Sequence, residues 1–135
     1  MSNEIHWDKS FEIGITEMDE QHRMLVSIAN EILSAKQQHI EDATIAKILD
    51  ALIEYTQQHF QHEEKLMEDM GYPNLPEHRR QHKMLMNDVL LFKSKFLTND
   101  LSIPELANFL KNWILDHIKE HDREYGTYLR SHGIV

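Results

Sequence analysis

The chain has 135 residues, a length that suits one domain with a core of useful size. It contains no cysteine, which excludes disulfides, thiolate metal sites, iron–sulfur clusters and cysteine nucleophiles. Its 14 basic and 23 acidic residues give a formal net charge of −9, which argues against nucleic acid and anionic membranes as partners.

The first residues of the chain have neither a basic region nor an apolar run of the kind that opens a signal peptide. No stretch approaches the roughly 18 apolar residues that a membrane-spanning helix needs. We therefore expect a cytoplasmic protein with no membrane insertion.

The chain opens with an arm and then becomes helical. Residues 1–16 show no helical period and contain Gly14, so we interpret them as an N-terminal arm laid on the rest. Thr16 fits the N-cap of a first helix over about 17–39, because acidic side chains, which favour a helix N-terminus, follow it. A second helix is predicted over about 42–70, with Gly71 as its stop.

Two further helices follow the turn at 72–76, which contains two prolines. The third is predicted over about 75–97. The fourth is predicted over about 103–131, because Ser102 and Glu105 fit a capping box and Pro104 lies in the first turn.

Each predicted helix carries apolar residues at helical spacing, as expected of a face turned toward a shared core. The stripes, in chain order, are Met18, Leu25, Ile28, Ala29, Ile32, Leu33; Ile45, Ile48, Leu49, Leu52, Ile53, Tyr55, Leu66; Met84, Leu85, Val89, Phe92, Phe96; and Leu106, Phe109, Leu110, Trp113, Ile114, Ile118, Tyr125. Four amphipathic helices with short connections predict an all-α fold, an up-down-up-down four-helix bundle in one domain over 1–135.

The chain has ten histidines, and their spacing is more informative than their number. Each predicted helix places histidines or acids at or near its apolar stripe: His22; His59 and Glu63; His78 and His82; His117 and Asp122. Residues four apart lie one turn apart on the same helix face. A single helical histidine is most often a surface residue, and an i,i+4 His–Glu pair is commonly solvated. Their joint occurrence on four helices favours a buried metal site, because burying these groups without a metal would be costly.

Imidazole and carboxylate are ligands for first-row metals such as iron, manganese and zinc. Seven such ligands exceed what one ion can take, so we expect two ions. Two carboxylate bridges and an oxo or hydroxo bridge would leave one coordination position open, where a small ligand can bind.

The order of these ligands, His, HxxxE, HxxxH and HxxxxD, resembles that of the hemerythrin family. The setting Asp19-Glu20-Gln21-His22 and the run from His59-Phe60 to Glu63-Glu64 look like its bacterial members, and the resemblance extends from Trp7 to about Tyr128. It implies a non-haem centre of two iron ions that binds dioxygen reversibly.

The resemblance also implies an unequal pair of irons. The imidazoles would divide three against two: His78, His82 and His117 on one ion, His22 and His59 on the other, which keeps the open position. Glu63 and Asp122 would bridge the two ions.

Two assignments stay open on geometric grounds. Asp122 lies five residues after His117, about 140° round a regular helix, whereas His121 lies four after it, and Glu120 is a further rival. We favour Asp122, because the family pattern has it and a second bridging carboxylate is needed. Glu64 lies five residues after His59, so we expect it to face away from that ligand.

We expect a binding protein for dioxygen, used in storage or delivery, with an oxygen-accepting protein as its natural partner. Oxygen or redox sensing through a partner protein is the first alternative. A di-iron oxidase or peroxidase is the second, but those sites typically use Glu-x-x-His pairs and more carboxylates. We therefore expect no enzyme activity, and a monomer.

Overall fold

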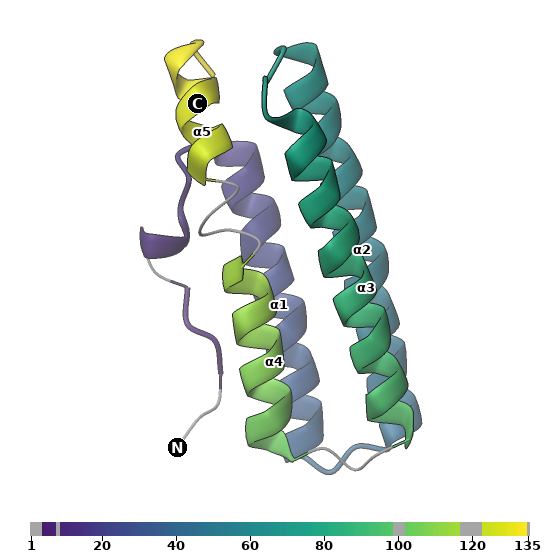
Figure 1. Cartoon of the computed structure of the whole chain (residues 1–135). Helices are drawn as coiled ribbons and strands as arrows, with labels where there is room; N and C mark the ends of the chain where they lie inside the picture. Colours follow the sequence, from purple (N-terminus) through teal and green to yellow (C-terminus); the bar gives the residue numbers. More distant parts are fainter. Residues whose placement is uncertain (1–3, 8, 99–101, 117–122, 135) are drawn as a thin grey trace.

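The computed structural model describes residues 4–7, 9–98, 102–116 and 123–134. Within them the regular elements are all helical (Figure 1), and their bounds are η1 Lys9–Phe11, α1 Thr16–Gln37, α2 Asp42–Asp69, α3 Leu75–Thr98, α4 Ile103–Asp116 and α5 Arg123–Ser131. The helices α1 to α4 lie side by side, α1 joins α2 at one end of the bundle, and α2 joins α3 at the other. The prediction of an all-α helical bundle is confirmed.

The first helix begins one residue earlier than predicted, and Thr16 is not its N-cap. Ile15 occupies the cap position and makes no side-chain cap hydrogen bond. Asp19 in the first turn instead accepts hydrogen bonds from the backbone N–H groups of Ile13 and Gly14, at 2.8 and 3.2 Å. The carboxylate therefore fixes the arm to the helix rather than capping the helix itself.

Two other end signals act as the sequence indicates. Gly71 follows Met70, the C-cap of α2, and has φ +67°, the left-handed conformation that commonly terminates a helix. The backbone N–H of Glu105 donates to the Ser102 hydroxyl at 3.2 Å, which confirms the predicted cap of α4. Residues 117–122 lie outside the described residues, so a single helix over 103–131 stays a prediction.

The core is formed by the predicted stripes, and the described members are buried or partly buried with one exception. Met84 is 48% exposed, which contradicts its assignment to the core. It lies two residues after the buried His82, about 200° round the helix, and its sulfur accepts a hydrogen bond from Arg80. Ile118 lies outside the described residues.

The N-terminal arm packs along the bundle. The Asn30 side chain of α1 pairs with the backbone of Ile5 through two hydrogen bonds of 2.7 and 2.8 Å. Phe11, Ile13 and Ile15 are buried. A Cβ atom on Gly126 of α5 would lie 2.9 Å from the Ile13 carbonyl oxygen, so the missing side chain allows arm and helix to approach closely.

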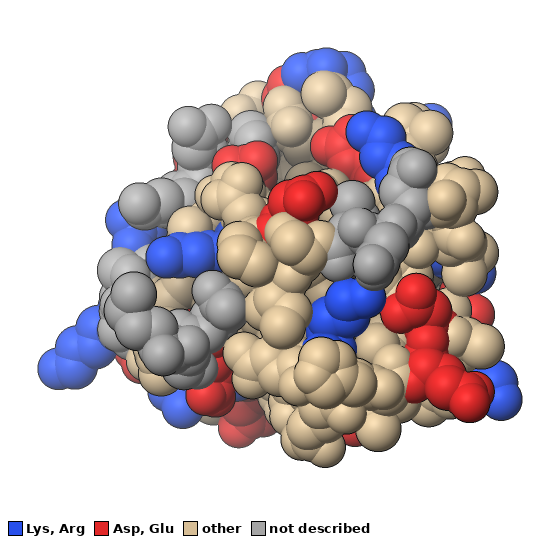
Figure 2. Space-filling model, turned by 90° about the horizontal axis from the view of Figure 1, so that it is seen from below, with Lys and Arg blue, Asp and Glu red and all other residues tan. Residues whose placement is uncertain are grey.

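At the end of the bundle seen in Figure 2, acidic and basic side chains are interspersed. The net charge of −9 is therefore not gathered on this face into a uniformly acidic patch. Among the described residues, no helix is both long enough and apolar enough to cross a bilayer.

Candidate metal centre

Five of the seven predicted ligands lie together inside the bundle. His22 comes from α1, His59 and Glu63 come from α2, and His78 and His82 come from α3. Their exposed fractions are between 0 and 4%. Three helices therefore place four imidazoles and one carboxylate in the core, where polar groups occur only when something compensates their lost hydration.

The local reason is helix periodicity. His59 and Glu63 are one turn apart on α2, and His78 and His82 are one turn apart on α3, so each pair shares a face with its helix's buried residues. His22 follows Met18 by one turn on the buried face of α1. The same spacing that builds the core therefore directs the ligands inward.

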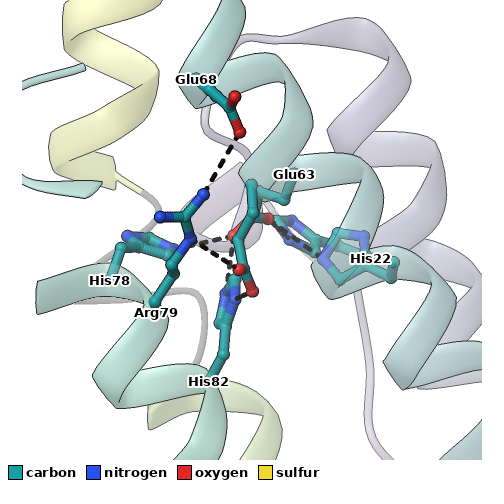
Figure 3. A network of polar contacts seen from close by, with 8 residues as sticks. His22, Glu63, Glu68, His78, Arg79 and His82 are labelled. Carbon is teal, nitrogen blue, oxygen red and sulfur yellow. Dashed lines mark hydrogen bonds and ion pairs between the residues drawn. The ribbon is translucent and has the colours of Figure 1, made fainter. Parts of the chain in front are cut away.

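Glu63 lies between two groups of imidazoles, as Figure 3 shows for His22 on one side and for His78 and His82 on the other. Its Oε2 atom is 3.2 Å from Nε2 of His59 and 3.8 Å from Nε2 of His22. Its Oε1 atom is 2.8 Å from Nε2 of His78 and 3.0 Å from Nε2 of His82. Each oxygen thus has its own pair of imidazole nitrogens.

This arrangement forms two potential metal sites that share one residue. In each group the ligand atoms lie within 4.8 Å of one another; the groups are His22, His59 and Glu63, and Glu63, His78 and His82. A carboxylate with one oxygen directed at each group is the arrangement that a bridge between two ions requires. The donor set of imidazole and carboxylate fits a pair of first-row metal ions.

The outer ring nitrogens of two ligands are held by hydrogen bonds. Nδ1 of His59 donates to Oε1 of Gln21 at 2.5 Å, and Nδ1 of His82 donates to Oε2 of Glu64 at 2.7 Å. With Nδ1–H engaged outward, Nε2 is the nitrogen left to bind a metal, which is how metal-binding histidines are usually oriented.

Glu64 contacts His82, which the sequence analysis missed. The hydrogen bond from His82 lowers the pKa of the Glu64 carboxyl, against the opposing effect of burial, and Arg79 lowers it further. For His82, burial acts to lower the pKa, but the hydrogen bonds to Glu63 and Glu64 outweigh it, so the pKa is raised. His82 therefore lies between two carboxylates.

Aromatic rings surround the imidazoles of His78 and His82. Phe60 stacks on His82 with ring centroids 3.8 Å apart and an angle of 5° between the planes. Tyr125 of α5 and Tyr72 contact His78 with centroids 5.7 and 6.5 Å apart. Sequence reasoning assigned Tyr125 only to the core and gave Phe60 and Tyr72 no role at the site. Phe60 lies next to His59 in sequence, and no spacing rule relates it to His82.

The contribution of the predicted fourth helix lies outside the described residues. This holds for His117 and Asp122 and equally for the rivals Glu120 and His121. Their parts in the site stay predictions. Trp113, one turn before His117, is buried and donates from its indole N–H to the Leu85 carbonyl at 2.9 Å, so it joins α4 to α3.

Comparisons with known proteins identify relatives of this chain. The hemerythrin HHE cation binding domain matches residues 13–129. A bacteriohemerythrin from Stenotrophomonas maltophilia is 31% identical over 126 residues, which cover 93% of this chain and 82% of that protein. One from Clostridium acetobutylicum is 34% identical over 124 residues, which cover 88% and 96%.

A solved structure of wild-type hemerythrin superposes with a TM-score of 0.79 at 26% identity, covering 91% of this chain and 95% of the other. The family holds a non-haem di-iron centre, and the His/Glu cluster around Glu63 is positioned to hold a metal centre. The domain match, the identity to relatives and the fold agree, and the chain belongs to the hemerythrin family.

Proposed function

We propose that this chain binds dioxygen reversibly at a di-iron centre and serves in oxygen storage or delivery. The observation that carries the proposal is the position of Glu63, whose two carboxylate oxygens face separate pairs of imidazole nitrogens. Family membership supports di-iron oxygen binding. The physiological use and the absence of enzyme activity are the further steps of the proposal.

The proposed ligand assignment extends the described cluster by two residues. His22 and His59 would hold the ion with the open position, His78 and His82 would hold the other together with His117, and Glu63 and Asp122 would bridge. When bound, the iron pair would supply the electrons that bind dioxygen and would take them back when dioxygen is released.

The protein's own residues have three tasks in this proposal. The neutral imidazoles bind the ions without adding negative charge, which would favour the oxidised state and make release harder. The hydrogen bonds to Gln21 and Glu64 fix the ring orientations of His59 and His82. The complete burial of His22 and Glu63 excludes water from the inner face of the site.

The decisive experiment is an oxygen cycle followed by visible spectroscopy. The iron-loaded protein is reduced without air, exposed to air and then returned to argon. The proposal expects a visible band that appears with air and disappears under argon through repeated cycles. A single irreversible change would contradict it and favour a di-iron oxidase or peroxidase.

The cycle needs a matched control, because a histidine change can act through folding. His6→Ala removes an exposed histidine of the N-terminal arm and should leave the reversible band in place, whereas His59→Ala, one turn from Glu63, should abolish it. Oxygen or redox sensing is the remaining candidate function. It also predicts a reversible band. It differs in requiring a partner protein whose binding depends on oxygen. The cytoplasmic location and the monomeric state stay predictions from the sequence.

A further inference from the structure

The imidazoles of His59 and His82 donate outward hydrogen bonds to different chemical groups. Nε2 of His59 faces Glu63 at 3.2 Å, and Nε2 of His82 faces it at 3.0 Å, so the inner geometry is nearly the same. On the outer side, a neutral amide accepts from His59, and an ionised carboxylate accepts from His82. The centre is therefore asymmetric in the groups behind its ligands.

The orientation of the Gln21 amide is fixed by a second contact. Its Nε2 lies 3.2 Å from Nδ1 of His62, and Nε2 of His62 lies 2.8 Å from Oε1 of Glu17. Because His62 Nδ1 accepts from the Gln21 amide, the amide oxygen is directed at His59. His62 thus has a role in the site although it is exposed and is not a ligand.

The Glu64 carboxylate is fixed in a corresponding way by Arg79. The Arg79 Nε donates to Glu64 at 3.2 Å, and another guanidinium nitrogen donates to Glu68 at 3.3 Å, as Figure 3 shows for Arg79 and Glu68. Glu64 also lines an open groove of about 740 Å³ along α2 and α3. One oxygen of Glu64 serves His82 and the other serves the guanidinium.

The chemical consequence concerns donor strength. A carboxylate that accepts the Nδ1–H bond draws the proton toward itself, which makes the Nε2 atom of that imidazole a stronger donor. An amide oxygen does this more weakly. A stronger donor favours the more highly charged, oxidised state of the ion that it binds.

We propose that Gln21 and Glu64 are positioning residues that give the two irons unequal redox character. Glu64, through His82, stabilises the oxidised form of one ion, whereas Gln21, through His59, leaves the other ion easier to return to the reduced form. This inference rests on the proposed function, in which His59 and His82 bind different ions. It places the weaker donor on the ion with the open position, where dioxygen must be released.

The test exchanges the two groups by Gln21→Glu, Glu64→Gln and the double variant. Glutamine and glutamate have nearly the same shape, and the double variant keeps the wild-type net charge. Glu68→Gln is the matched control for Glu64→Gln, because it removes the same charge beside the same arginine without removing the contact to His82. Gln61→Glu adds a charge at an exposed α2 position and controls for Gln21→Glu.

The readouts are the midpoint potential of the iron-loaded protein and its Mössbauer spectrum. Glu64→Gln should raise the potential, with a change of about tenfold in the reduction equilibrium, or about 59 mV for a one-electron step. Gln21→Glu should lower it by a comparable factor. In the double variant the signals of the two irons should move in opposite directions, and the mean potential should stay near that of wild type.

Several results would overturn the inference alone. One is a Glu68→Gln shift as large as that of Glu64→Gln, which would show a net-charge effect. Another is an unchanged potential in exchange variants that still hold two irons. If the variants fail to fold, NMR of the imidazole N–H groups in the zinc-loaded wild type provides the test. The Nδ1–H signal of His82 should lie downfield of that of His59. Equal signals would contradict the inference. A wild-type chain that takes up fewer than two irons would overturn the proposed function as well.

Discussion

The two sides of Glu63 are built by different rules. The side facing His78 and His82 comes from one helix, whose two imidazoles are four residues apart and so lie one turn apart on one face. The side facing His22 and His59 joins two successive helices, α1 and α2, and the ring centroids of the two histidines are 4.9 Å apart. The first side can be derived from spacing alone, whereas the second exists only because α1 packs on α2.

The two sides also differ in their surroundings. His82 stacks on Phe60 and contacts a carboxylate beside an open groove, whereas His22 has no exposed surface at all. This difference indicates that a shared carboxylate connects two unequal environments. Substitutions can show which residues both groups of imidazoles need to bind metal and which residues only one group needs.

The largest effect is expected for Glu63→Ala. Because Glu63 serves both groups of imidazoles, its loss should reduce iron content from about two per chain to well below one, measured by metal analysis after anaerobic loading. Glu64→Ala should lower affinity for iron by about tenfold to a hundredfold, through His82 alone. If Glu64→Ala loses both irons and Glu63→Ala keeps them, the assignment on α2 is wrong.

A second large effect separates the candidates on the predicted fourth helix. Asp122→Ala should remove one anionic donor from each iron, so the centre should lose iron or become unable to cycle with oxygen. His121→Ala should leave iron content and the visible band close to wild type. The reverse pair of outcomes would make His121 the ligand, and the predicted fourth helix could then stay regular through that turn.

The sequence predicts the site best where the spacing of residues within one helix determines their direction. The helical bundle, the inward direction of His78 and His82 and the pairing of His59 with Glu63 all follow from periods near four residues. The contact between His82 and Glu64 joins two helices, so the position of Glu64 relative to His59 could not reveal it. Gln21 and Phe60 act at the site through packing between helices, for which spacing gives no signal.

A moderate effect is expected from metal removal. Bound iron stabilises the native chain by mass action, so chelation under reducing conditions should lower the melting temperature by about 10 °C when free metal was a hundredfold to a thousandfold above its Kd. The helical circular dichroism signal should persist, because the apolar stripes remain.

Lowering the pH through the histidine range should also lower the melting temperature, since protonated imidazoles release metal. An unchanged melting temperature would count against a buried centre.

The smallest effect is expected at the arm. Asn30→Ala removes the two hydrogen bonds to the backbone of Ile5 and should reduce the free energy of unfolding by about 1–3 kcal/mol, measured by denaturant titration. Asn30 contacts the arm rather than the cluster, so iron content should stay at the wild-type value. A loss of iron in this variant would show that the arm supports the centre and that the two regions are coupled.

The central claim is that Glu63 lies between two ions, each with its own imidazoles. Anomalous scattering at the iron edge, from crystals of the anaerobically loaded protein, tests this most directly. The account predicts two iron peaks on opposite sides of the Glu63 carboxylate, one beside His22 and His59 and the other beside His78 and His82, with one carboxylate oxygen bound to each. A single peak, or two peaks with Glu63 bound to neither, would contradict it.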